Sequence, residues 1–280
     1  MSTQVDLFTT VEPTSVSPAI AKPFVSRSTF YQGDCLVEMD KIADKSVDMI
    51  LCDLPYGTTA CKWDSVIPFE PLWKHYERII KDNGAIVLTG SQPFTSALVM
   101  SNPKLFKYEW IWEKSKASNF VHVNYQPMKA HENILVFSKY PAAQNSAKKN
   151  MVYNPIKTQG EPYNRGKVKI TEGVLTGGRK KQVEVMSING ERHPRSVQYF
   201  KTAEFDGTVH PTQKPIALYN YLLREFAKDG NKILDTHLGS GASRIACYNK
   251  FDFVGCEIDL DYFQKQEIFF RKDRKSTRLN

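Results

Sequence analysis

The stretch Asp53-Leu54-Pro55-Tyr56-Gly57 combines a carboxylate, an aromatic ring and chain-breaking residues directly after the apolar run 47–52. Such a run predicts a buried strand, and proline followed by glycine predicts that the strand ends at a turn. The turn would hold Asp53, the Leu54 carbonyl and the Tyr56 ring at the carboxyl edge of a sheet, where ligands bind in open α/β folds. These groups suit a planar ring with an exocyclic amine, which could stack on Tyr56 and donate to the two acceptors. A strand with an ordinary turn fits the same five residues, so their partners must decide.

A second candidate site is Leu234-Asp235-Thr236-His237-Leu238-Gly239-Ser240-Gly241, which joins a predicted strand (232–235) to a predicted helix (242–249). Glycines let a backbone approach a ligand, and the start of a helix offers unpaired amides. Glu257 follows Gly241 by 16 residues at the end of the next predicted strand, where an acid can bind ribose hydroxyls. The pair predicts a cofactor that contains adenosine. The sequence has neither the Lys-Ser/Thr of a triphosphate-binding P-loop nor a full nicotinamide-type G-x-G-x-x-G.

The third candidate is His210-Pro211-Thr212-Gln213-Lys214-Pro215, at the start of the most regular helical pattern, 215–228. The prolines fix the entry to this helix, and Thr212 and Lys214 could hold a carboxylate at its N-terminal end. A capped helix start without a ligand fits these residues equally well.

Alternating strand and helix patterns position the three candidates, which predicts an α/β domain with parallel strands. The remaining predicted strands are 28–32, 85–89, 108–113, 133–138 and 251–256, and the remaining helices are 72–81, 92–100 and 262–270. Residues 1–23, rich in Pro, Ser and Thr, are predicted to be a disordered arm. The polar, basic residues 272–280 are predicted to be a disordered tail.

Composition narrows the class of protein. With 280 residues and 41% apolar residues, the chain can form one large or two ordinary domains. It has no run of about 18 apolar residues and no visible secretory signal, so no membrane association is predicted. Five scattered cysteines without a CxxC pair argue against a zinc site and a disulfide framework. These features predict a cytoplasmic protein without a metal site.

The net charge of +8 is concentrated in two segments: +6 in residues 140–208 and +4 in the last ten, which leaves −2 elsewhere. Segment 140–208 has no sustained periodicity, although 168–170 and 183–186 can pair as short strands. A basic segment on a near-neutral body is typical of phosphate binding, whereas lysines on a loop-rich surface are the alternative. The basic residues predicted to bind DNA are Arg165, Lys167, Arg179, Lys180, Lys181, Arg192 and Arg195.

The three candidates, in this order, resemble the amino-methylating DNA methyltransferases of the beta, or permuted, group. Gly33-Asp34-Cys35-Leu36 and the segment 129–137 resemble flanking segments of that family, and the resemblance spans about residues 28–270. It implies a circularly permuted, Rossmann-like class I methyltransferase sheet. It also implies S-adenosylmethionine as the cofactor and a base flipped out of double-stranded DNA as the substrate.

The resemblance divides the chain into a catalytic half (24–139), a target-recognition insert (140–208) and a cofactor-binding half (209–271). The strands that end at Asp235 and Glu257 are expected to open the sheet and those that end at Asp34 and Asp53 to continue it, which would put Glu257, Asp34 and Asp53 at neighbouring strand ends. Glu257 would then bind ribose, Asp34 the adenine of the cofactor, and Asp53 the substrate. The residues expected to be catalytic are Asp53, Leu54, Pro55 and Tyr56. Those expected to bind the cofactor are Asp34, Cys35, Asp53, His210, Thr212, Lys214, Asp235, Gly239, Ser240, Gly241, Glu257 and Ile258.

Two positions depart from the family pattern. Leu54 stands where proline is usual, but only its carbonyl is needed, so activity is expected. Thr236-His237 stands where Pro-Phe is usual, which could loosen the packing of the cofactor. We interpret His237 as a structural substitute rather than a catalytic base.

The predicted acceptor is the N6 amine of adenine, because the motif begins with Asp53, whereas N4-cytosine members more often begin with Ser. Cytosine-C5 methylation is excluded, since it needs a cysteine after proline and none of the five cysteines follows one. Motif order argues against protein-glutamine methylation. A catalytically inactive DNA-binding homologue would fail to bind S-adenosylmethionine. A homodimer and a restriction endonuclease partner are compatible with the resemblance.

Overall fold

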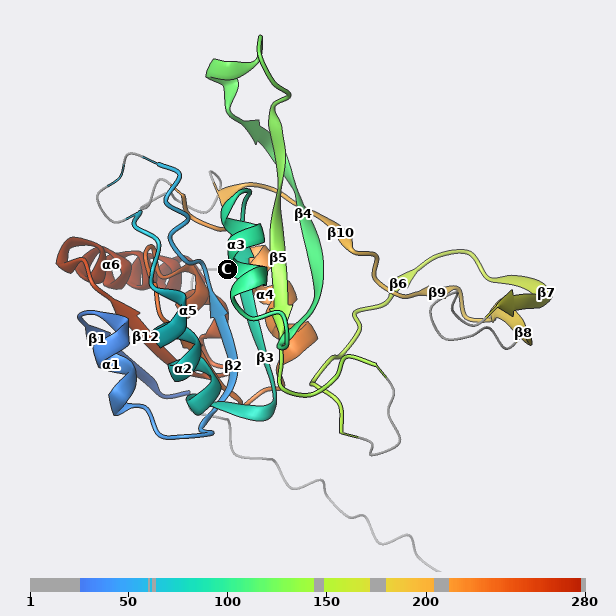
Figure 1. The fold of residues 1–280 in the computed structure, drawn as a ribbon, viewed down its shortest axis with the longest axis horizontal. Coiled ribbons are helices and arrows are strands. Elements are labelled where there is room, and N and C mark those ends of the chain that lie inside the picture. Colours follow the sequence, from blue (N-terminus) through green and yellow to red (C-terminus); the bar gives the residue numbers. More distant parts are fainter. Residues whose placement is uncertain are drawn as a thin grey trace, which may run out of the picture.

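A central sheet of eight strands organises the fold, in the order β1-β12-β11-β2-β3-β5-β4-β10 (Figure 1). The computed structural model describes residues 26–59, 61, 64–143, 149–171, 180–203 and 212–277. In this sheet β5 runs antiparallel to both its neighbours, and all other neighbouring pairs are parallel. The strands are β1 (Ser28–Gln32), β2 (Val47–Cys52), β3 (Ile80–Gly90), β4 (Phe106–Ser118), β5 (Lys129–Phe137), β10 (Val197–Phe200), β11 (Lys232–Asp235) and β12 (Asp252–Glu257).

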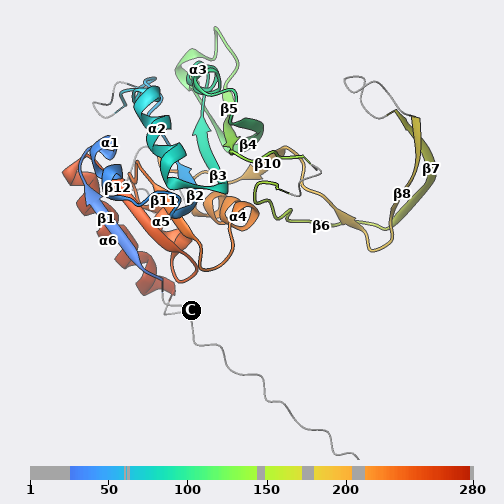
Figure 2. The ribbon, with the colours of Figure 1, turned by 60° about the horizontal axis from the view of Figure 1, so that its bottom comes forward.

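Helices cover both faces of the sheet, since successive side chains of a buried strand point to opposite faces. In β2, Ile50 packs in one core cluster with residues of α2 and α3, and Met49 and Leu51 pack in a second with residues of α4 and α5. Figure 2 shows the two helical layers on either side of the strands. The helices are α1 (Cys35–Glu38), α2 (Phe69–Ile79), α3 (Phe94–Ser101), α4 (Ile216–Phe226), α5 (Ala242–Cys247) and α6 (Leu260–Thr277), with 3₁₀ turns η1 (Met39–Lys41) and η2 (Phe120–His122). The predicted α/β class is confirmed.

The strand order corrects one expectation. The strands that end near Asp34 and at Glu257 are neighbours, as expected, but β11 separates them from β2, which ends at Asp53. Along the carboxyl edge the acids therefore follow the order Asp34, Glu257, Asp235, Asp53. The polar, partly exposed sequence of β1 explains its place at the edge of the sheet, because an edge strand is covered on fewer sides than a central one.

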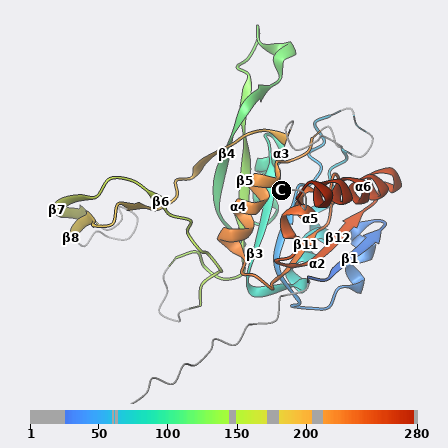
Figure 3. The same ribbon diagram turned by 180° about the vertical axis from the view of Figure 1, so that it is seen from behind.

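The basic segment 140–208 forms two small ribbons and then rejoins the main sheet. The ribbons pair β6 (Thr158–Gln159) with β9 (Glu191–Arg192), and β7 (Tyr163–Thr171) with β8 (Lys180–Ser187). Val168 lies opposite Val183, so the predicted strand pairing is confirmed. The β7–β8 ribbon projects away from the body (Figures 1 and 3). By contrast, β10 pairs with β4 in the main sheet, so the expected insert is not wholly separate from the body.

Helix α6 and the strands β4 and β5 are longer than the sequence predicts. Helix α6 continues to Thr277, so the expectation of a disordered tail is wrong for residues 272–277. Arg274 explains part of this order, because its guanidinium lies 4.7 Å from the Tyr248 ring centroid and so has a packing partner. Strands β4 and β5 extend beyond their predicted ends into a long hairpin. The predicted arm 1–23 lies outside the described residues. None of the helices within the described ranges is long and apolar enough to cross a membrane.

Candidate active site

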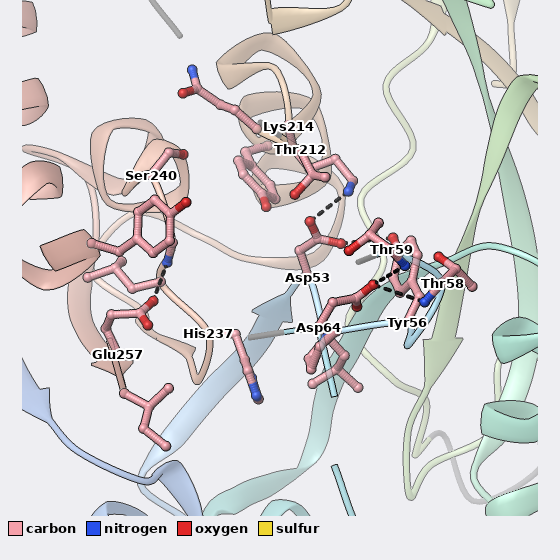
Figure 4. Close-up of a pocket in the computed structure, with 18 residues that line it drawn as sticks. Asp53, Tyr56, Thr58, Thr59, Asp64, Thr212, Lys214, His237, Ser240 and Glu257 are labelled. Carbon is pink, nitrogen blue, oxygen red and sulfur yellow. Dashed lines mark hydrogen bonds and ion pairs between the residues drawn. The ribbon is translucent and has the colours of Figure 1, made fainter. Parts of the chain in front are cut away.

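Asp53 lies where β2 ends, and both of its carboxylate oxygens are held by neighbouring side chains (Figure 4). Oδ2 accepts a hydrogen bond from Lys214 Nζ at 2.6 Å. Oδ1 accepts from the hydroxyl of Thr89, at the end of neighbouring β3, and lies 2.8 Å from the hydroxyl oxygen of Tyr56. These contacts fix the orientation of the carboxylate before any ligand binds.

The Tyr56 ring stacks on Phe94, with centroids 5.2 Å apart and an interplanar angle of 26°. Lys214 Nζ lies 5.4 Å from the same ring centroid. Burial, followed by the charges of Asp53 and Glu132, raises the pKa of the Tyr56 hydroxyl well above its ordinary value. Tyr56 is therefore a neutral hydrogen-bond donor at physiological pH. That it stacks on a substrate ring stays a prediction.

The loop after the turn is held by Asp64, a residue that the sequence analysis did not single out. Its carboxylate accepts from the backbone amides of Gly57, Thr58 and Thr59 at 2.8, 2.9 and 2.6 Å. Gly57 has a φ of +66°, a backbone conformation that favours glycine. Burial opposes ionisation of Asp64, but the hydrogen bonds outweigh it and hold the pKa of this carboxyl below its ordinary value. The loop is thus fixed by one ionised side chain.

Two adjoining chambers meet at this loop. The first, with a cavity volume of about 110 Å³, lies over the ends of β2, β11 and β12. The second, of about 720 Å³, lies between the loop and the stems of β4 and β5, so it is the one with more room for a nucleotide. Residues that line both chambers are Tyr56, Thr58, Thr59, Thr212, Gln213 and Lys214.

Glu257, at the end of β12, is hydrogen-bonded to the glycine loop that follows the neighbouring strand β11. Its Oε2 accepts from the amide of Gly239 at 2.7 Å, and its Oε1 accepts from the amide of Asp259 at 2.9 Å. The side chain is buried, and burial raises the pKa of this carboxyl. The structure brings together, around the first chamber, the predicted residues Asp53, Leu54, Pro55, Tyr56, Thr212, Lys214, Gly239, Ser240, Glu257 and Ile258.

Other predicted cofactor residues do not line this chamber and have structural partners instead. Asp34 caps α1 by accepting from the amide of Leu36 at 2.9 Å. Asp235 is buried and accepts from the Ser243 hydroxyl at 2.6 Å, and burial raises its pKa to about 6. Burial likewise raises the pKa of the Cys35 thiol to about 12. Gly241, at a φ of +79°, is the residue before α5, and His210 lies outside the described residues.

Lys214 contacts a second acid that the sequence analysis left without a role. Its Nζ lies 3.3 Å from Glu132 Oε2, and Lys114 Nζ lies 3.4 Å from the other oxygen of Glu132. Lys214 was expected to hold the carboxylate of a cofactor, but here its amine pairs with Asp53 and Glu132. Glu132 belongs to the segment 129–137 that resembles the family, so the signal was present although no chemistry could be read from it.

Comparison with known proteins identifies the family. The sequence profile of the N6/N4 methyltransferases, described as DNA methylase, matches residues 47–268, which is most of the chain. The chain belongs to the N6/N4 DNA methylase family. S-adenosylmethionine as the methyl donor is thereby confirmed at the level of the family.

Individual relatives agree with this family, and one of them is named as an adenine methyltransferase. The chain is 25% identical to the type II methyltransferase M1.MboII of Moraxella bovis over 254 residues, which cover 83% of this chain and 92% of that protein. It is 27% identical over 259 residues to the DNA adenine methyltransferase YhdJ of Escherichia coli (strain K12), covering 84% and 80%.

Solved structures share the fold. The M1.HpyAVI–SAM complex matches with a TM-score of 0.57 at 20% identity, covering 86% of this chain and 98% of that one. The cytosine-N4-specific PvuII DNA methyltransferase matches with a TM-score of 0.61 at 13% identity, covering 88% and 87%. At these identities the likeness shows the fold alone.

The predicted DNA-binding residues of this DNA methylase belong to the basic segment 140–208, called the projecting segment below. Arg165 and Lys167 are exposed on β7, and the guanidinium groups of Arg165 and Arg192 lie 5.5 and 4.5 Å from the ring centroid of Tyr163. Arg195 is exposed just before β10. The backbones of Lys180 and Lys181 lie in β8, whereas their side chains and all of Arg179 lie outside the description. Contact of these residues with DNA stays a prediction.

His237 lines the first chamber of the methylase as a neutral ring. Its Nδ1 lies 3.1 Å from Thr236 Oγ1 and 3.5 Å from Cys52 Sγ. Desolvation lowers the pKa of the imidazole to about 4. An uncharged aromatic ring therefore occupies the position at which the family usually has phenylalanine.

His237→Phe is expected to raise the free energy of unfolding more at pH 5 than at pH 7.5, by about 1–2 kcal/mol. The folded imidazole has a pKa of about 4 and the unfolded one about 6.5. Between these values the unfolded state binds a proton that the folded state does not. The wild type therefore loses stability as the pH decreases from 7.5 to 5, and the variant, which has no imidazole, does not show this loss. Denaturant unfolding at both pH values measures the difference. An equal change in the free energy of unfolding at both pH values would contradict a neutral imidazole in the folded protein.

Proposed function

We propose that this DNA methylase transfers the methyl group of S-adenosylmethionine to the exocyclic N6 amine of an adenine flipped out of duplex DNA. The observation that carries the proposal is the position of Asp53, a pre-oriented carboxylate of the first chamber that contacts Tyr56 and Lys214, two residues that line both chambers. One chamber would take the cofactor, and the other would take the flipped base. Flipping is required because the amine is not accessible within the stacked duplex.

The residues around the first chamber fit the cofactor. Glu257 presents a buried carboxylate beside the glycine loop, as a ribose diol requires, and Ile258 next to it is exposed as an apolar surface. Ser240 and Thr212 add hydroxyl groups to the lining. When bound there, S-adenosylmethionine supplies an electrophilic methyl group.

The chain's own residues would orient the acceptor amine. Asp53 and the Leu54 carbonyl would accept its two hydrogens and turn its lone pair towards the first chamber, so orientation would be the main catalytic contribution. A carboxylate has about four acceptor positions, so Asp53 can accept from the amine while Thr89 and Lys214 hold it. The position of Asp53 at the start of the motif favours adenine.

The second candidate is N4-cytosine methylation on the same scaffold, which the fold shared with a cytosine-N4-specific enzyme favours. The two bases present comparable exocyclic amines, so the site chemistry would be the same. A cytoplasmic location, a homodimer and a restriction endonuclease partner stay predictions.

Expression of the chain in bacterial cells that lack DNA methylation tests the proposal. Sequencing that reads modified bases is expected to find N6-methyladenine at one short sequence, which also gives the recognition site. N4-methylcytosine at such a sequence would replace the proposal by the second candidate. Unmodified DNA, with soluble protein in the cells, would overturn both.

Arg165→Ala, Lys167→Ala and Arg192→Ala together are expected to flatten the salt dependence of DNA binding. The plot of log K against log salt concentration has a negative slope, and each lost phosphate contact should make this slope less steep by about 0.9. Binding titrations at several salt concentrations measure this slope. A control with the same charge change replaces exposed lysines of the body, Lys74, Lys104 and Lys228, with alanine. Equal flattening by both variants would contradict a specific role of the projecting segment.

A further inference from the structure

The hairpin formed by β4 and β5 carries an exposed apolar tip that the proposed site does not use. It rises beyond the sheet, away from the helical layers (Figures 1 and 3). The large side chains there are strongly exposed: Phe120 by 73%, Val121 by 81% and Tyr125 by 89%. Exposed apolar side chains that cluster in this way mark a contact with a partner.

The tip is a structured turn. Asn119 begins it in the left-handed conformation, with a φ of 72°, and the 3₁₀ turn η2 follows. The amides of Tyr125 and Gln126 both donate to the carbonyl of His122, at 2.9 and 3.0 Å. The exposed side chains are therefore presented from an internally hydrogen-bonded backbone, which lowers the entropy cost of a contact.

Charge indicates the kind of partner. From Lys114 to His131 the sequence contains three lysines and no acidic residue. The stem of the hairpin also lines the second chamber, with three lysines (Lys114, Lys116 and Lys129) and one acid, Glu132, which pairs with Lys114. The basic stem thus connects the chamber assigned to the flipped base with the apolar tip. A polyanion that engages the chamber would run along this stem.

We propose that the tip, residues 119–128, is a wedge that enters the base stack of duplex DNA where the target base leaves it. Phe120, Val121 and Tyr125 would cover the base faces exposed by flipping, as apolar and aromatic side chains do when they insert between base steps. The inference rests on the proposed function, since it needs a flipped base. It adds a source of the free energy that offsets unstacking.

The test replaces Phe120, Val121 and Tyr125 with serine and compares methyl transfer to two duplexes. One contains the recognition sequence fully paired, and the other mispairs the target base, which lowers the cost of flipping. The variant is expected to lose about 10- to 100-fold in kcat/KM on the paired duplex, as the loss of one or more stacking contacts would give. On the mismatched duplex the loss should be about threefold or less.

A matched control replaces three exposed apolar residues of the body, Val37, Met100 and Ile268, which are 60%, 72% and 56% exposed. It should keep wild-type rates on both duplexes. No loss in the tip variant, or equal losses on both duplexes, would overturn the wedge. A dimer in sedimentation that the tip variant converts to a monomer would overturn it in favour of a second copy of this chain as the partner. If the wild type methylates neither duplex, the proposed function itself fails.

Discussion

Asp53→Asn is expected to lower the rate of methyl transfer about 10²- to 10⁴-fold, the range for losing a positioned acid–base or electrostatic group. An amide of the same shape keeps one acceptor oxygen but loses the charge and places an NH₂ group where the substrate amine donates. Folding should survive, because Lys214 retains Glu132 as a partner at 3.3 Å. Binding of S-adenosylmethionine, measured by calorimetry, separates a loss of amine orientation from a loss of cofactor binding, since Asp53 also lines the first chamber.

A control for this variant is Asp48→Asn in the same strand. Asp48 lies at the opposite end of β2, pairs with Lys81 and is exposed to nearly the same degree, 19% against 20% for Asp53. It should retain methyl transfer at about the wild-type rate. Equal rates for both variants would contradict the role of Asp53 in orienting the amine.

Lys214→Met is expected to lower the free energy of unfolding by about 3–5 kcal/mol at pH 8, the cost of removing one partner of a buried ion pair. Lys214 is 5% exposed, and its amine lies between Asp53 and Glu132. Burial disfavours the charged amine, but the two acids outweigh it and raise the pKa of Lys214 above its ordinary value. Its stabilising contribution is thus complete below the unfolded pKa of about 10.4 and is lost only as the pH rises through the folded pKa.

Without Lys214 the two carboxylates of Asp53 and Glu132 lose the cation that they share, and this uncompensated negative charge is the origin of the loss in stability. Adding Glu132→Gln to Lys214→Met removes one of the two acids and should recover about 1–2 kcal/mol at pH 8. If the effects of the two substitutions on the free energy of unfolding simply add, the network is contradicted.

The parts of the site that follow a strand directly could be predicted from the sequence. Asp53 follows an apolar run, and the glycine turn that ends at Gly241 follows another. A residue that follows a parallel strand lies at the carboxyl edge of the sheet whichever strands are its neighbours. Glu257 was found for the same reason. The order of the strands was not predictable from the same signals, since parallel strands are joined by crossovers that pass over other strands.

Contacts between distant residues account for what the sequence missed. Thr89 meets Asp53 because β3 lies beside β2, and Glu132 meets Lys214 because β5 lies on the other side of β3 in the folded sheet. Asp64 is close in sequence to the amides it holds, but a polar loop without periodicity does not indicate which acid turns inwards. The length of the hairpin was missed because residues 114–118 of β4 are polar or small and lack the apolar alternation that predicts a strand.

The most direct test of the account is analysis of the nucleosides formed in vitro. Purified protein, S-adenosylmethionine with an isotopically labelled methyl group and unmethylated genomic DNA are incubated, and the DNA is digested and separated by chromatography with mass detection. The account predicts label in N6-methyladenine, and its loss with Asp53→Asn but not with Asp48→Asn. Label confined to N4-methylcytosine would contradict adenine as the acceptor, and label that persists with Asp53→Asn would contradict the site itself.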